Sequence, residues 1–196
     1  KGKITIGGTD IKTVDPESLL SAYSIVFQDV TLFDNTVMEN IRIGRKDASD
    51  GEVLRAAEEA RCGEFVSRLP NGYQTMIGEN RYQNRRSRKH RAERQRISIA
   101  RALLKDAPVI LLDEATASLD AENETLIQEA ISRLVRDKTV LIIAHRMRTV
   151  EGADKLVFVK DGAVAETGSP AGLLAKNGLY AKSAALQKQS GEWLLK

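Results

Sequence analysis

The chain has 196 residues, of which 42% are hydrophobic and 29% are charged. This length suits one ordinary domain, and the balance excludes a disordered or collagen-like chain. No apolar run approaches the roughly 20 residues that span a bilayer, so we expect neither a transmembrane segment nor a secretory signal. The single cysteine, Cys62, cannot form an internal disulfide. We therefore expect a reducing compartment and a packing role for this thiol.

The net charge of +3 is distributed unevenly along the chain. The arginine-rich segment, residues 81–96, contains eight Lys and Arg residues and one acid, and it carries a net charge of +7. The rest of the chain is therefore acidic, with a net charge of −4. Because the basic charge belongs to one segment, it gives little support to a general nucleic-acid-binding surface.

Apolar periodicity predicts short strands that alternate with helices. The predicted strands are Lys3–Ile6, Tyr23–Phe27, Val109–Leu112, Thr139–Ala144 and Lys155–Val159. The predicted helices cover about 50–69, the end of the arginine-rich segment through Leu104, Leu126–Val135, and 179–196 with a loose end. Pro70–Gly72 reads as a turn. The strand–helix–strand order predicts a parallel sheet, with the strands at 109–112 and 139–144 buried on both faces.

Polar residues follow three of these predicted strands. Gln28 follows the second strand, Asp113 and Glu114 follow the third, and His145 follows the fourth. In nucleotide hydrolysis one acid can hold magnesium while its neighbour orients the attacking water. An acidic pair alone also fits the start of a solvated loop. Three strand ends that carry polar residues instead predict one crevice at the carboxyl edge of the sheet.

Long stretches of the chain resemble the nucleotide-binding domain of exporter-type ABC transporters. SIVFQDVTLFDNTVMENI resembles the Q-loop and the residues after it, and VILLDEATASLD resembles Walker B with the D-loop. LIIAHRMRTVEGADKLVFVKDGAVAETGSPAGLL resembles the H-loop and the C-terminal part, and GLYAKSAALQ resembles exporter tails. The resemblance covers nearly the whole chain outside residues 81–92.

The resemblance implies an α/β fold, with a P-loop NTPase-like core, a parallel sheet and a helical subdomain. The chain, 1–196, would be a partial ATP-binding domain. The helical subdomain would cover about 30–105 and include the arginine-rich segment. Residues 106–178 would form part of the catalytic core, and 179–196 a C-terminal helix and tail.

The resemblance also implies the cofactors ATP and Mg²⁺ and the roles of the site residues. Gln28 would contact the magnesium and sense the γ-phosphate. Asp113 would hold the magnesium, Glu114 would act as the general base on water, and His145 would contact the γ-phosphate.

The implied function is ATP hydrolysis that drives transmembrane export. The domain would form a head-to-tail dimer with a second nucleotide-binding domain, and Ser118 and Asp120 in the D-loop would act across that interface. The transmembrane domain of the exporter would be the other partner, which places the chain on the cytoplasmic side of the cell membrane.

The chain departs from the family in lacking the Walker A pattern G-x-x-x-x-G-K-[ST]. In the family this loop precedes the strand that here reads KITIGG, and its amides and lysine cradle the phosphates. The aromatic residue that stacks on adenine lies further upstream. We therefore expect a chain that begins after Walker A and does not turn over ATP by itself.

A second departure is the signature motif, which reads roughly G-x-x-L-S-G-G-E-R-Q-R in the family. Glu93–Arg96 keep the last four residues, but Lys89–Ala92 replace Leu-Ser-Gly-Gly. The segment Asn80–Glu93 is also about five residues longer than usual, a change that loops absorb. Glycine lets bare backbone approach a phosphate, which arginine prevents. We expect the crowded cations to fray the start of this helix.

The arginine-rich segment has three interpretations. The first is a solvated or disordered insertion, and the second is a locally altered sequence. The third is an RNA-binding helix in which Asn84 and Gln95 read bases. The corresponding alternatives to an exporter ATPase are a catalytically inactive fragment or altered form of such a domain and, ranked last, RNA binding through Arg81–Arg96.

Overall fold

The structure is a computed structural model, and it describes residues 2–78, 88–113, 121–144 and 149–193. The chain divides into two compact units. Unit 1 is Lys1–Ile143, and unit 2 is Ala144–Lys196.

Unit 1 alternates strands and helices, as predicted. Its strands are β1 (Thr5–Ile6), β2 (Thr9–Asp10), β3 (Tyr23–Val26), β4 (Asn35–Thr36), β5 (Met76–Ile77), β6 (Val109–Asp113) and β7 (Thr139–Ile143). Its helices are α1 (Pro16–Ser21), α2 (Val37–Arg42), α3 (Asp50–Glu59), α4 (Gly63–Val66), α6 (Arg88–Lys105) and α7 (Ala121–Leu134), with 3-10 turns η1 (Ile11–Thr13) and η2 (Gly72–Gln74). The strand predicted at the N-terminus is confirmed in a shorter form, as one half of the antiparallel hairpin β1–β2.

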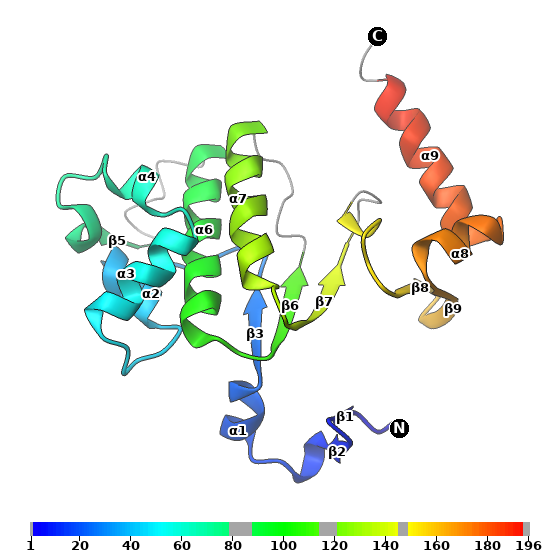
Figure 1. The fold of residues 1–196 in the computed structure, drawn as a ribbon, viewed down its shortest axis with the longest axis horizontal. Coiled ribbons are helices and arrows are strands. Elements are labelled where there is room, and N and C mark those ends of the chain that lie inside the picture. The colour runs from blue at the N-terminus through cyan, green and yellow to red at the C-terminus, as the bar shows by residue number, and fades with distance from the viewer. Residues whose placement is uncertain (1, 79–87, 114–120, 145–148, 194–196) are drawn as a thin grey trace. The chain divides into compact units, whose positions relative to one another are not determined.

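A parallel sheet forms the centre of unit 1. Its three strands lie in the order β3-β6-β7, so β6 is the middle strand. Val26 pairs in register with Leu112, and Leu112 pairs with Ile142. Helices α6 and α7 lie side by side against this sheet (Figure 1). The predicted α/β fold and its crossover connections are therefore confirmed.

Only one face of this sheet is buried within the described part of unit 1. Ile110 and Leu112 are buried in the core with residues of α6 and α7. On the opposite face, Leu141 is 62% exposed and Ile143 is 57% exposed. The expectation that β6 and β7 are buried on both faces is thus wrong here. Alternate residues of a strand point to opposite faces, and the described helices cover one of them.

The single helix expected over 50–69 is in fact two helices, α3 and α4. The chain turns at Arg61, which has a φ of 58°. The Cys62 N–H donates to the Ala57 carbonyl at 2.8 Å, and the Arg61 N–H donates to the Glu58 carbonyl at 2.9 Å. These two bonds form a Schellman motif, which ends α3. The apolar periodicity did not predict the end of α3. The position just after a helix that ends in this way is usually glycine, and here it is Arg61.

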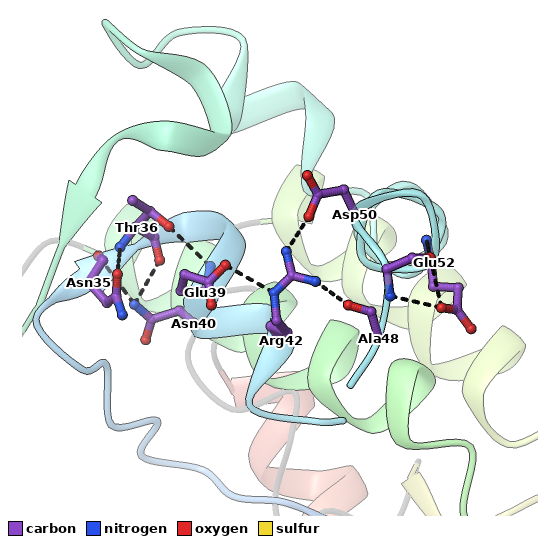
Figure 2. A network of polar contacts seen from close by, with 9 residues as sticks. Asn35, Thr36, Glu39, Asn40, Arg42, Ala48, Asp50 and Glu52 are labelled. Atoms are coloured by element: carbon purple, nitrogen blue, oxygen red, sulfur yellow. Dashed lines mark hydrogen bonds and ion pairs between the residues drawn. The ribbon is translucent and has the colours of Figure 1, made fainter. Parts of the chain in front are cut away.

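Side chains also define where α2 ends and α3 begins (Figure 2). Arg42, in the last turn of α2, pairs with Glu39 at 2.9 Å, and its guanidinium contacts the Ala48 carbonyl and Asp50. Hydrogen bonds to Glu39 and Asp50 raise the pKa of Arg42. Ser49 and Glu52 form a capping box at the start of α3.

Helix α6 begins at Arg88 and therefore contains the second half of the arginine-rich segment. The expectation that the cations fray this start is wrong for residues 88–92, which are helical. Two acids lie close to this start: Glu93 lies 3.0 Å from His90 Nδ1, and Asp29 lies 3.6 Å from Arg91. The first half of the segment, with Asn84, lies outside the described residues.

Unit 2 consists of a hairpin and two helices. β8 (Leu156–Lys160) and β9 (Ala163–Gly168) pair antiparallel around Asp161 and Gly162, which both have positive φ. α8 (Pro170–Ala175) and α9 (Leu179–Trp193) follow. The strand predicted near 155–159 and the C-terminal helix are confirmed, and the predicted loose end at 194–196 lies outside the described residues.

The carboxylate of Glu166 on β9 caps the start of α9. It accepts the Leu179 N–H at 2.6 Å and the Tyr180 N–H at 3.0 Å. A Cβ on Gly178 would lie 2.0 Å from Glu166 Oε1, so a larger residue there would displace the carboxylate from this position. The amide hydrogen bonds from Tyr180 and Leu179 lower the pKa of Glu166.

We predict that Glu166→Gln lowers the melting temperature at neutral pH but has little effect near pH 3. A lowered folded pKa means that the carboxylate stabilises the fold above its unfolded pKa of about 4.3. That contribution is lost as the pH falls through the folded pKa. Thermal unfolding of both proteins between pH 3 and 7 measures the difference, with Glu151→Gln as the control. A difference that does not change with pH contradicts this role.

Candidate functional site

The carboxyl ends of β3, β6 and β7 meet at one edge of the parallel sheet. Asp113 is the last residue of β6 and pairs in register with Ile143, the last residue of β7. Gln28 follows the end of β3 by two residues, and that end, Val26, is level with Leu112. The structure thus brings Gln28 and Asp113 to neighbouring strand ends, as the sequence predicted.

Four of the predicted site residues lie outside the part of the chain that the structure describes. They are Glu114, Ser118, Asp120 and His145. Glu114 directly follows β6, and His145 follows β7 by two residues. Their roles stay predictions.

Gln28 and Asp113 both have side-chain oxygens that are free to accept a ligand. Both side chains are half-buried, and neither forms a hydrogen bond or ion pair with the described residues. No group of three or more His, Cys, Asp or Glu side chains in the described ranges is arranged to hold a metal. Magnesium usually keeps several waters and takes one or two protein oxygens plus phosphates. This donor pair fits such an ion better than a metal that needs a full protein cage.

Helix α6 holds the backbone that follows Gln28. Arg94 Nη1 donates to the Val30 carbonyl at 3.3 Å, and Arg101 Nη1 donates to the Thr31 carbonyl at 2.9 Å. Arg91 lies 3.6 Å from the Asp29 carboxylate. Cations spaced along one helix therefore contact three successive residues of this segment. Arg91 and Arg94 belong to the arginine-rich segment and Arg101 lies beyond it, and the sequence did not predict any of these contacts.

Asn40 on α2 binds the continuation of this segment at Phe33. Its side chain is fully buried; Oδ1 accepts the Phe33 N–H at 2.9 Å, and Nδ2 donates to the Phe33 carbonyl at 2.9 Å. Nδ2 also approaches the carbonyls of Thr36 at 3.0 Å and Asn35 at 3.4 Å (Figure 2). One signal was available in the sequence: Asn40 lies three residues after Val37 and next to Ile41, which is the apolar face of α2.

The retained end of the signature motif points into the protein. Arg96 is only 2% exposed, donates to the Arg61 carbonyl at 3.1 Å and lies 5.1 Å from the centre of the Phe65 ring. Burial lowers the pKa of this guanidinium. Gln95 is 3% exposed, so the prediction that Gln95 reads RNA bases is wrong: its side chain is removed from solvent.

Cys62 has the packing role that the sequence predicted. The thiol is fully buried in the core, and burial raises its pKa to about 12. A thiol with so high a pKa carries almost no thiolate at neutral pH and is a poor nucleophile.

Comparisons with known proteins agree with the resemblance seen in the sequence. A family model described as "ABC transporter" matches residues 1–117. The chain is 45% identical over 182 residues to an ATP-dependent lipid A-core flippase of Vibrio parahaemolyticus, covering 92% of this chain and 30% of that protein. It is 46% identical over 190 residues to a beta-(1→2)glucan export ATP-binding/permease protein of Rhizobium meliloti, covering 97% of this chain and 31% of that protein.

A solved structure gives the same result. The chain resembles a bacterial Atm1-family ABC exporter with ATP bound, with a TM-score of 0.83 and 40% identity over 95% of this chain and 32% of that chain. The chain therefore spans about a third of the length of these relatives. Among the described residues, no helix has both the length and the apolarity needed to cross a membrane.

We predict that Mn²⁺, used as a probe for Mg²⁺, broadens the amide signals of Gln28 and Asp113 in nuclear magnetic resonance spectra of residues 1–196. Two protein oxygens hold such an ion weakly, so we expect the effect at about millimolar concentration. Asp113→Asn should remove it because the charged ligand is lost. Asp106→Asn is the control, since Asp106 precedes β6 and pairs with Lys138 at 2.5 Å. Equal broadening in both variants excludes Asp113 as a ligand.

Proposed function

This chain belongs to the ABC transporter family, and from that premise we propose that it is the ATP-binding and ATP-hydrolysing part of an exporter. One observation carries the proposal: the order β3-β6-β7 brings Gln28 and Asp113 to neighbouring strand ends. Parallel α/β sheets bind ligands at this edge. The residues that follow the same strand ends are those to which the family resemblance gives catalytic roles.

Asp113 and Gln28 are the residues that would hold the magnesium ion of Mg-ATP. Their free oxygens suit a hard cation. When bound, the ion neutralises charge on the phosphates that develops during phosphoryl transfer. Asp113 supplies the negative charge for this site, and Gln28 supplies a neutral oxygen from the neighbouring strand end. In this proposal Gln28 also responds to the γ-phosphate.

Glu114 is the proposed general base. It directly follows Asp113, the proposed magnesium ligand. In this role its carboxylate accepts the proton of the water that attacks the γ-phosphate. His145 follows the adjacent strand β7 and is the proposed contact to the γ-phosphate. These assignments rest on the motifs and on the strand order, since both residues lie outside the described ranges.

The proposed partners are a second nucleotide-binding domain and a transmembrane domain. The name of the Rhizobium meliloti relative contains both "ATP-binding" and "permease", and the solved relative is an exporter. This supports a domain on the cytoplasmic side of the membrane. Ser118 and Asp120 are proposed to act across a head-to-tail dimer interface.

RNA binding through Arg81–Arg96 is not favoured as a second function. Within the described part of this segment, Arg91, Arg94 and Arg96 contact other groups of unit 1. The Arg96 guanidinium is removed from solvent and cannot reach a phosphate, and Arg91 and Arg94 already have partners in unit 1.

We predict that Glu114→Gln nearly abolishes ATP hydrolysis and preserves ATP binding. The test uses a fusion in which a segment with the pattern G-x-x-x-x-G-K-[ST] precedes Lys1. The amide keeps the shape of the side chain but cannot take a proton, and base catalysis contributes about 10²–10⁴-fold. Phosphate release measures turnover, calorimetry measures binding, and Glu124→Gln in α7 is the control. Undiminished turnover removes Glu114 from this role.

We also predict that this fusion, with Glu114→Gln, binds ATP but does not dimerise. The reason is that cationic side chains replace the small residues that let a helix start approach the partner's phosphates. Replacing residues 81–92 with a G-x-x-L-S-G-G stretch should produce an ATP-dependent dimer. Size-exclusion chromatography with light scattering, with and without Mg-ATP, measures the dimer fraction. If the dimer fraction is equal before and after the replacement, the arginine-rich segment does not prevent ATP-dependent dimerisation.

A further inference from the structure

We propose that Arg101 is a positioning residue of this site, which acts through Asn40 and Thr31 to hold the backbone that leads away from Gln28. The proposal deepens the proposed function, on which the importance of Gln28 rests. Arg101 lies on α6, and Asn40 lies on α2, whereas Gln28 follows β3. The contact joins α6, α2 and the segment at Thr31, which follows Gln28 in the chain.

The guanidinium of Arg101 contacts three oxygen atoms at once. Its Nε donates to the Asn40 carbonyl at 2.7 Å, and its Nη2 donates to Asn40 Oδ1 at 2.9 Å. Its Nη1 donates to the Thr31 carbonyl at 2.9 Å. A planar guanidinium presents its donors in fixed directions, so these bonds define how α2 and the segment at Thr31 lie against α6. Lysine has no such fork.

Asn40 transmits this contact to Phe33. Its Oδ1 accepts from both Arg101 and the Phe33 N–H, and its Nδ2 donates to the Phe33 carbonyl. Rotating the amide by 180° would place its NH₂ against these two donors, so only one orientation satisfies the network. Arg101 thereby sets the amide of Asn40, and Asn40 sets both backbone groups of Phe33.

The chain just after α2 packs closely against α6 at Gly44. A Cβ on Gly44 would lie 2.2 Å from the Arg101 carbonyl, so the backbones approach as closely as glycine allows. The Phe33 ring lies 5.9 Å from the guanidinium carbon. Burial lowers the pKa of Arg101 to about 10, and the group remains protonated at neutral pH.

The charge on Arg101 has no acidic partner within the described residues. Its hydrogen bonds all go to neutral oxygens. Removing a cation from water costs free energy unless acceptors replace the water, and here the acceptors belong to Asn40 and to the segment after Gln28. Gln28 is thus held between β3, which ends at Val26, and the bound carbonyl of Thr31.

The test measures amide hydrogen exchange in residues 1–196 and in the variants Arg101→Leu and Arg101→Lys. The Phe33 amide is the reporter because its acceptor, Asn40 Oδ1, is held by Arg101. We expect at least about tenfold faster exchange of this amide in Arg101→Leu, relative to core amides of α6, and a smaller increase in Arg101→Lys. If Arg101→Leu does not fold, Arg101→Lys alone decides the outcome.

Lys105→Met is the matched control. Lys105 lies on the same helix, but its ammonium has other partners. It donates to the carbonyl of Leu20 on α1 at 2.7 Å and to that of Tyr23, the first residue of β3, at 2.8 Å. This variant loses bonds between a cation and carbonyls without touching Asn40. If the Phe33 amide exchanges no faster in the Arg101 variants than in Lys105→Met, the proposal is overturned.

A second readout separates positioning from stability alone. In Arg101→Lys, Mn²⁺ should broaden the side-chain amide signal of Gln28 several-fold less than in the wild type, while the Asp113 signal still responds. An unchanged Gln28 response in a variant with fast Phe33 exchange means that Arg101 is structural only, and overturns the proposal. If Gln28 does not respond even in the wild type, the metal role in the proposed function is wrong, and the exchange result still shows whether Arg101 holds the segment.

Discussion

The cationic side chains of helix α6 bind backbone carbonyls from several segments of unit 1, and this constrains where those segments lie. A guanidinium or ammonium that leaves water needs oxygen acceptors, and loop carbonyls need donors. Each contact therefore satisfies two groups. The pairs are Arg94 with Val30, Arg96 with Arg61, Arg101 with Thr31 and Asn40, and Lys105 with Leu20 and Tyr23.

The apolar side chains of the same helix pack against the sheet and form part of the core. Ile97, Ala100 and Leu104 of α6 belong to one buried core with Ile110 and Leu112 of β6. Apolar burial, at about 25 cal/mol per Å², favours the contact but does not specify the path of a loop. The hydrogen bonds from the cations have direction, so they supply that specification. The site at the sheet edge depends on both.

This double use of α6 changes how the arginine-rich segment is understood. Its second half, from Arg88 onwards, is part of the helix that organises unit 1, and Arg91 in it pairs with Asp29. It is therefore not a solvated insertion over those residues. The departure from the family's small residues lies at the start of a helix whose remaining length is well packed.

The sequence alone was sufficient for the three strands of the parallel sheet, the longer helices and the family, because periodicity and long motifs are local properties of the chain. It also indicated that Gln28 and Asp113 follow strands that end at one edge of the sheet. It did not predict the short strands β2, β4 and β5, the strand β9, or the short helices α1, α2 and α8. It did not show that α3 and α4 are separate, because a Schellman turn at Arg61 lacks the usual glycine. The exposed face that carries Leu141, and the contacts of Asn40 and Arg101, were decided only by tertiary structure. Those contacts join residues about 60 positions apart, as between Asn40 and Arg101, and no local pattern encodes which carbonyl a distant guanidinium will reach.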